Sequence, residues 1–316
     1  MKPSGPGLIG LAVACGTAAW AAPAAVTVQE LCREGAAPQT NVYRRVDGHD
    51  LYLYVHAPAA PDPAQPRPAI VTIHGGGWGA PGPFRFTPHC RYFAGRGLVA
   101  INVEYRLTNP TNSPLRNCIG DCQAALRYVR AHAAELGVDP ERIAVLGDSA
   151  GGHLAACLGL MPDVDSPPPG ERAVSAVPNA LILCNPVVDL ESLAWTHNVP
   201  GVKPLSSDTV SQAEDWPERA RAVSPIRYVH AGLPPMLLIH GTADTCVSVE
   251  QIDRFAKAVK DAGNRCQYER VEGWEHAFVL MGYAPDATSI PATQLIDRFL
   301  AGLGWLGGEP TIRSAK

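Results

Sequence analysis

The sequence predicts an α/β fold: a mostly parallel central sheet with helices on both faces. Strand-like and helical segments alternate over most of the 316 residues, as expected for a chain of βαβ units. Residues 69–73 form a short, largely apolar run, which suits a strand that is covered on both faces. Residues 147–151 read G-x-S-x-G between an apolar run and a helix-compatible segment, the arrangement of a strand, a tight turn and a helix.

The composition fits a chain with a sizeable buried core. Hydrophobic residues make up 46% and charged residues 18% of the chain, which excludes a mainly disordered protein. The net charge is −4, and Lys and Arg do not cluster into a stripe, so no nucleic-acid partner is expected. The length suits one large domain, which we place at residues 22–316.

Residues 1–21 have the pattern of a secretory signal peptide. Lys2 precedes an apolar run at 8–14, and residues 19–21 give a small-x-small cleavage pattern. We therefore expect a secreted or periplasmic protein. Lipid anchoring on Cys15 is a weaker alternative, because no Leu stands three residues before it. Stable membrane insertion is not expected, since the strongly apolar core of the segment is short.

The first half of the domain predicts a hairpin followed by strand–helix units. Asp47-Gly48 between two strand-like runs favours a β-hairpin. Apolar side chains recur at helical spacing over 116–136, and Gly137 and Pro140 end that helix. In chain order, we expect a hairpin over 41–55, strands over 69–73, 98–103 and 143–146, and helices over 88–96 and 116–136.

The second half continues the alternation, with one interruption. We expect helices over 149–160, 251–262 and 293–301, strands over 180–184, 236–239 and 267–271, and little order past Leu303. Residues 185–235 are about fifty residues rich in Pro, Trp and Ser, including Trp195 and Trp216. That is long for a connector, so we interpret the segment as a lid or cap inserted over the strand ends of the same domain.

Ser149, at the centre of the G-x-S-x-G motif, is the predicted nucleophile. The flanking glycines allow a strained turn and close packing of the helix on the sheet. Ser149 then lies at a helix N-terminus, where the helix dipole favours developing negative charge. The alternative is a glycine-rich turn with a capping serine.

A second glycine-rich turn, H-G-G-G-W at 74–78, directly follows the apolar run at 69–73. Backbone N–H groups of Gly76, Gly77 and Ala150 are the expected oxyanion donors. We interpret His74 as a residue that orients this loop. Trp78 is interpreted as a wall of the substrate pocket, with a place in the core as the alternative.

The base and the acid follow from chain order, which is Ser, acid, His in sheet enzymes of this kind. Asp244 follows an apolar strand within H-G-T-A-D, and His276 is the one histidine after it. We therefore expect His276 to act as base and Asp244 to orient it. Asp189, which follows the preceding strand, is the rival acid.

These motifs resemble the α/β-hydrolase superfamily, and most closely its acetyl esterase and lipase branch, near hormone-sensitive-lipase-like and feruloyl-esterase-like enzymes. The resemblance covers roughly residues 42–302, and Ser248 departs from it where relatives often carry Pro. The residues that carry it are HGGGW at 74–78, EYRL at 104–107, GDSAGGHL at 147–154, PPMLLIHGTAD at 234–244 and GWEHAF at 273–278.

The resemblance implies a serine hydrolase that cleaves carboxylic esters through an acyl-enzyme, without a metal or another cofactor. We expect a short acyl group, acetyl above all, on a small-molecule or carbohydrate alcohol. The export signal together with the resemblance favours a carbohydrate-linked ester. A lipase for longer chains, an exopeptidase or amidase, and a ligand-binding receptor on a hydrolase scaffold remain alternatives. Nine cysteines, or eight without Cys15, permit disulfides in an exported chain, and neither their pairing nor the oligomeric state follows from the sequence.

Overall fold

The structure is a computed structural model that describes residues 24–33, 35–59, 64–108, 115–164, 174–193 and 216–315. The predicted signal peptide and Cys15 lie outside the described residues. So does the middle of the predicted lid, residues 194–215, which includes Trp195.

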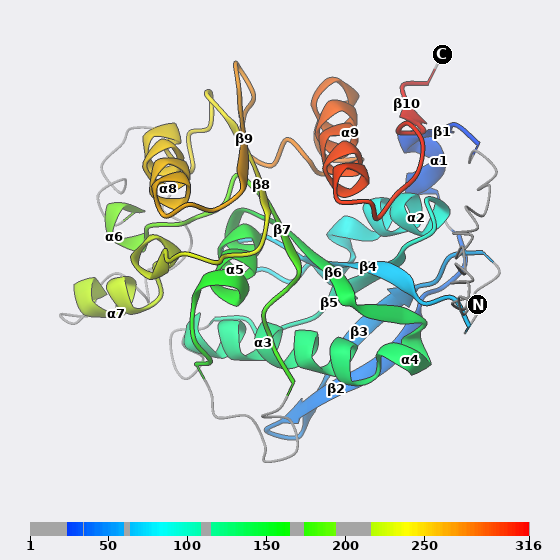
Figure 1. The fold of residues 1–316 in the computed structure, drawn as a ribbon, viewed down its shortest axis with the longest axis horizontal. Coiled ribbons are helices and arrows are strands. Elements are labelled where there is room, and N and C mark those ends of the chain that lie inside the picture. Colours follow the sequence, from blue (N-terminus) through cyan, green and yellow to red (C-terminus); the bar gives the residue numbers. More distant parts are fainter. Residues whose placement is uncertain are drawn as a thin grey trace, which may run out of the picture.

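The expected parallel sheet with helices on both faces is present (Figure 1). Its eight strands stand in the order β2-β3-β5-β4-β6-β7-β8-β9, and all pairs from β5 to β9 are parallel. The strands are β2 (Gln39–Val46), β3 (His49–His56), β4 (Arg67–Ile73), β5 (Val99–Val103), β6 (Val138–Asp148), β7 (Ala180–Cys184), β8 (Met236–Gly241) and β9 (Cys266–Val271).

The predicted N-terminal hairpin forms the antiparallel edge of this sheet. Asp47 and Gly48 both have positive φ, 52° and 78°, as a two-residue hairpin turn of type I′ requires. Strand β3 then pairs antiparallel with β5, which leaves β2 as the outer strand.

Two layers of helices cover the sheet and create two hydrophobic cores. Successive residues of β4 face opposite sides: Val71 and Ile73 lie in one core, and Ile70 lies in the other, as the two-residue period of a strand requires. The first core holds side chains of α3 (Leu115–Ala131), α5 (Ser149–Leu160) and α8 (Val249–Asp261), and the second those of α1 (Val28–Cys32), α2 (Thr87–Gly95) and α9 (Asp286–Gly302).

Two predictions about helix bounds differ from the structure by more than two residues. The helix expected over 116–136 divides at His132 into α3 and a short α4 (Ala133–Leu136), which Gly137 ends with φ 68°. Helix α9 begins at Asp286, seven residues before the expected start, and contains Pro291. Pro291 lies in the second turn, where its missing N–H removes at most one helical hydrogen bond.

The prediction of little order past Leu303 is wrong. Strand β10 (Ile312–Arg313) pairs in parallel with β1 (Val26–Thr27). The guanidinium of Arg96 donates to the carbonyl groups of Gly307 and Gly308, so residues distant in sequence hold this segment in place.

The described ends of the predicted lid pack on each other beside the sheet. They include α6 (Leu190–Leu193), α7 (Trp216–Ala222) and the 3-10 turn Pro225–Tyr228. Glu191 on α6 forms ion pairs with Arg221 and Arg227. The role of this segment as a lid stays a prediction, because its middle lies outside the described residues.

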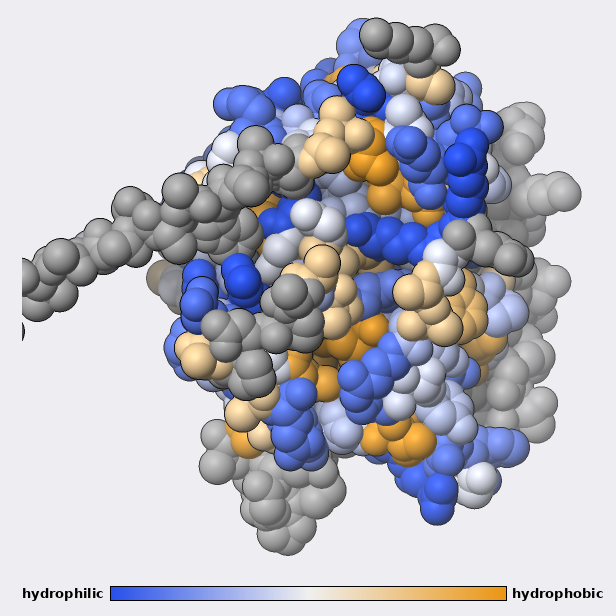
Figure 2. Space-filling view, turned by 90° about the vertical axis from the view of Figure 1, so that its right-hand side faces the viewer, coloured by the Kyte–Doolittle hydropathy of each residue, from blue (hydrophilic) through white to orange (hydrophobic). Residues whose placement is uncertain are grey.

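All eight described cysteines are free thiols, and five of them are buried. On the face shown in Figure 2, hydrophobic residues form small separate groups among hydrophilic ones. No helix in the described part of the chain is long and apolar enough to cross a membrane.

Candidate active site

Ser149 occupies a strained turn between β6 and α5. Its φ is +52°, a value that non-glycine residues rarely adopt. A Cβ on Gly147 would lie 2.2 Å from the carbonyl oxygen of Gly151, and a Cβ on Gly151 would lie 2.0 Å from that of Ile73. Both positions therefore require glycine, which explains the spacing of the G-x-S-x-G motif.

The structure brings together the three residues expected to form the triad. The hydroxyl of Ser149 lies 2.8 Å from Nε2 of His276, and Nδ1 of His276 lies 2.7 Å from a carboxylate oxygen of Asp244. Asp244 follows β8 and His276 follows β9, so neighbouring parallel strands place both at the carboxyl edge of the sheet. With Nδ1–H donating to the carboxylate, Nε2 is left to accept the Ser149 proton.

Asp244 is held as a carboxylate by its surroundings. Its side chain is fully buried, and its second oxygen accepts the backbone N–H groups of Cys246 and Val247 at 2.8 and 2.9 Å. Burial raises the pKa of Asp244, but the hydrogen bond and charge of His276 and the N–H of Val247 outweigh it, so the net pKa is below the usual value.

The rival acid, Asp189, lies in a different environment. Its carboxylate accepts the N–H of Glu191 and pairs with the half-exposed Arg254. The structure thus places Asp244, and not Asp189, against His276.

The glycine turn after β4 offers the expected oxyanion donors. Gly76 and Gly77 have φ of +111° and +60°, and the carbonyl of Gly76 accepts the N–H of Ala80, which closes the turn. Within the described residues, no acceptor takes the N–H of Gly76 or Gly77. Ala150 is the second residue of α5, and N–H groups in the first turn of a helix have no partner within it. These amides are therefore available to a developing oxyanion.

Asp148 couples the two turns, a role that the sequence analysis missed. Its buried carboxylate accepts the N–H of Gly75 at 2.8 Å, and a Cβ on Gly75 would meet that carboxylate at 2.7 Å. Burial raises the pKa of Asp148. Because Asp148 directly precedes Ser149, this bond ties the oxyanion loop to the nucleophile.

His74 has the orienting environment that the sequence suggested. Its ring stacks on Tyr105 with 4.4 Å between ring centroids, and Tyr105 donates to the carbonyl of His74 at 2.8 Å. Burial lowers the pKa of His74 to about 4, so the ring is neutral near pH 7. Nδ1 of His74 donates a hydrogen bond to the carbonyl of Gly75 in the same loop.

Trp78 packs in the core instead of on an open wall. Only 5% of its surface is exposed, and its indole N–H donates to Nδ1 of His153 at 3.2 Å. Nε2 of His153 in turn donates to the carbonyl of Val223 at 2.7 Å. This placement fits the alternative of a core residue and not that of a pocket wall.

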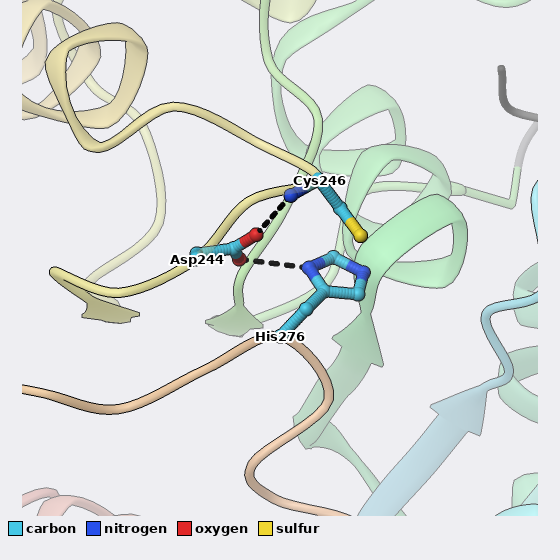
Figure 3. A group of neighbouring side chains, drawn as sticks. All are labelled: Asp244, Cys246 and His276. Carbon is cyan, nitrogen blue, oxygen red and sulfur yellow. Dashed lines mark hydrogen bonds and ion pairs between the residues drawn. The ribbon is translucent and has the colours of Figure 1, made fainter. Parts of the chain in front are cut away.

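One thiol lies beside the triad, and the sequence analysis gave it no role. Figure 3 shows the side chain of Cys246 directed toward the imidazole of His276, while Asp244 faces Nδ1 of the same ring. One ligand atom from each of these three residues lies within 4.8 Å of the others. They form the one group in the described part of the chain that could hold a metal ion.

The fold and the site together define a serine hydrolase of the α/β-hydrolase superfamily. The nucleophile, the base, the carboxylate and the amide donors each stand at the carboxyl edge of a parallel sheet, where this fold assembles its chemistry. A serine paired in this way supports acyl transfer by side chains and backbone alone.

The chain matches the BD-FAE family over residues 53–259, and it belongs to this family, within the esterase and lipase branch of the superfamily. It is 29% identical to esterase LipQ of Mycobacterium tuberculosis, over 69% of this chain and 52% of that protein. It thus spans about half the length of LipQ. Carboxylesterase NlhH of the same organism is 35% identical, over 84% of this chain and 83% of its own.

A solved structure is similar over nearly its whole length. Esterase 2 of Thermogutta terrifontis, in a propionate-bound form, has 42% identity and a TM-score of 0.75, over 86% of this chain and 97% of that one. A butyrate-bound form of the same esterase matches with the same identity and TM-score, over 86% of this chain and 96% of its own.

Proposed function

We propose that the protein is a carboxylic-ester hydrolase that acts on short-chain, acetyl-type esters through an acyl-enzyme. The observation that carries this proposal is the continuous hydrogen-bonded path from Ser149 through His276 to Asp244, with distances of 2.8 and 2.7 Å. Relatives named esterase and carboxylesterase support the same reaction class.

The geometry accounts for each step of that reaction. Nε2 of His276 takes the hydroxyl proton while Ser149 attacks the ester carbonyl, and Asp244 stabilises the imidazolium. The oxyanion is stabilised by the N–H groups of Gly76, Gly77 and Ala150. The imidazolium then protonates the leaving alcohol. A water molecule, activated by the same imidazole, hydrolyses the acyl-enzyme and restores Ser149.

Support for a short acyl group comes from esterase 2 of Thermogutta terrifontis, which has propionate-bound and butyrate-bound forms. Acids of three and four carbons suit a small acyl site. The proposal of a carbohydrate-linked ester depends on the feruloyl-esterase-like motifs and the predicted export signal. We accordingly propose a small-molecule or carbohydrate ester as substrate and a secreted or periplasmic location.

A panel of esters tests the acyl preference. We expect p-nitrophenyl acetate to have a higher kcat/KM than p-nitrophenyl decanoate, with Ser149→Ala protein as the blank. EDTA should leave the rate unchanged, because every assigned group belongs to the chain. A higher kcat/KM for the decanoate would favour the lipase, and faster cleavage of p-nitroacetanilide than of the acetate ester would favour the amidase.

A matched comparison of alcohols tests the carbohydrate link. Release of acetate from an acetylated xylo-oligosaccharide and from ethyl acetate should be measured under the same conditions. A higher kcat/KM for the sugar ester is the expected result. An equal or lower kcat/KM for the sugar ester would contradict the carbohydrate preference and would remain consistent with a short-chain esterase.

A further inference from the structure

The thiol of Cys246 occupies a position that the esterase mechanism does not use. Cys246 is half-buried and lies two residues after Asp244 in the loop that follows β8. Its backbone N–H donates to the Asp244 carboxylate at 2.8 Å. That bond fixes the backbone of the loop, and the side chain extends toward the imidazole of His276 (Figure 3).

We propose that Cys246, His276 and Asp244 form an inhibitory site for a divalent cation that prefers thiolate and imidazole ligands, of which Zn²⁺ is the example. Cys sulfur, His nitrogen and Asp oxygen are the ligand types that bind zinc in proteins. The inhibition by this cation rests on the proposed esterase function, whereas its binding does not.

The spacing of the three groups suits such an ion after a small adjustment. The ligand atoms lie within 4.8 Å of one another. Zinc bonds of about 2.0–2.3 Å in a tetrahedron separate neighbouring ligand atoms by roughly 3.5 Å. A side-chain movement of about 1 Å would therefore close the site, and a water molecule would complete the tetrahedron.

Charge balance favours the bound state. Binding of Zn²⁺ releases the Cys246 thiol proton to solvent, because the thiolate is the ligand. The thiolate and the Asp244 carboxylate then carry two negative charges, and the imidazole stays neutral. The complex has no net charge, so a partly buried site can hold it at a lower desolvation cost than a bare ion.

Either mode of histidine coordination stops the esterase reaction. If the ion binds Nε2, it occupies the lone pair that accepts the Ser149 proton. If the ion binds Nδ1, the single proton of the neutral ring moves from Nδ1 to Nε2, and Nε2 can then no longer accept a proton from Ser149. The cation would also hold Asp244 and His276 in one rigid unit.

A second half-buried cysteine provides a matched control. Cys266 is at the start of β9, is a free thiol like Cys246, and does not belong to the three-residue group. Loss of Cys266 should therefore leave the response to Zn²⁺ unchanged.

The activity test compares Zn²⁺ inhibition of the full chain and its variants, each relative to its own rate without metal. We expect Cys246→Ser and Cys246→Ala to raise the half-inhibitory Zn²⁺ concentration by about tenfold or more. Cys266→Ser should match the unsubstituted protein, and EDTA should restore the rate. Equal sensitivity of both Cys246 variants and the unsubstituted protein would overturn the proposal.

A binding test separates this inference from the proposed function. Ser149→Ala keeps all three ligands and needs no activity for the measurement. Co²⁺ titration of this variant should give a sulfur-to-cobalt charge-transfer band in the near ultraviolet, and Ser149→Ala/Cys246→Ala should lack it. If Ser149→Ala gives the band but the unsubstituted chain has no esterase activity, only the proposed function is refuted. Absence of the band, with Zn²⁺ heat of binding equal in both variants, would refute the site.

Discussion

Two buried carboxylates, Asp244 and Asp297, show how the same residue type serves catalysis in one region and stability in another. Both side chains are fully buried. Asp244 accepts Nδ1–H of His276 at 2.7 Å. Asp297, on α9, accepts two bonds from Arg96 at 2.8 and 3.0 Å and one from Tyr92 at 2.6 Å.

The side chain that pairs with each carboxylate decides whether the carboxylate serves catalysis or stability. An arginine guanidinium does not exchange its charge for chemistry in proteins, and only 1% of the Arg96 side chain is exposed, so its pair with Asp297 is a fixed, closed contact between the end of α2 and α9. His276 is 19% exposed, and an imidazole is the side chain that most often transfers protons in enzymes. A buried carboxylate therefore supports chemistry when its partner titrates and reaches an accessible nucleophile.

The backbone differs between the two regions as well. Asp297 lies within a regular helix. Around the active site, positive φ angles occur at Ser149, Trp78 and Ala277, in the segments at or after the carboxyl ends of β6, β4 and β9. Such strain persists where surrounding contacts hold it, and here it positions the nucleophile and the oxyanion loop.

Ser149→Ala should produce the largest effect, a loss of roughly 10⁶ in kcat. Ala has nearly the same size and would occupy the same strained turn, so we expect the melting temperature to stay close to that of the unsubstituted protein. Hydrolysis of p-nitrophenyl acetate and thermal unfolding measure the two effects. Retention of most of the activity would show that Ser149 is not the nucleophile.

Asp244→Asn should lower kcat by about 10⁴, because an amide no longer holds His276 in the tautomer that accepts from Ser149. Asp189→Asn is the matched control and should retain activity, since Asp189 pairs with Arg254 away from the base. The measurement is kcat for p-nitrophenyl acetate in both variants. A larger loss in the Asp189 variant would make Asp189 the acid.

Asp297→Asn should act on stability instead of catalysis. The substitution leaves the Arg96 charge buried without its partner, which costs about 3–5 kcal/mol in the free energy of unfolding. Urea unfolding measures this loss, and kcat of the folded fraction should stay near its original value. Asp189→Asn again serves as the control, because an exposed pair contributes only about 0–1 kcal/mol. Similar losses in both variants would contradict the distinction between the two regions.

His153→Gln should produce the smallest effect, visible as a change in how stability depends on pH. Burial lowers the pKa of His153 to about 4 in the folded protein, against about 6.5 in the unfolded chain. Between these values the unfolded chain binds a proton that the folded protein excludes. Stability therefore falls as the pH drops from about 6.5 toward 4.

The size of this effect follows from the two pKa values. Between pH 7 and pH 5 the unsubstituted protein should lose about 2 kcal/mol more of its free energy of unfolding than the Gln variant. Urea unfolding at both pH values gives the difference. An equal pH dependence in the two proteins would mean that burial does not hold His153 neutral in the folded protein.

Much of the site was predictable because its parts carry local signals. The G-x-S-x-G spacing records the close approach of Gly147 and Gly151 to neighbouring backbone. The acid follows the apolar strand β8 and the base follows the neighbouring strand β9, and parallel strands bring their carboxyl ends to one edge. The alternation of strands and helices likewise indicated the sheet, including the hairpin turn at Asp47-Gly48.

By itself, the sequence determined the fold class and the order of nucleophile, acid and base along the chain, because periodicity and motif spacing are properties of short segments. Only the tertiary structure decided that Asp148 ties the oxyanion loop to the nucleophile, that Cys246 lies beside His276, and that Arg96 orders the C-terminal segment. The physical reason is that the partners in most of these contacts lie far apart in the chain. No local pattern of residues encodes such a contact. The thiol of Cys246, for example, lies beside the imidazole of His276 because β9 places that ring there.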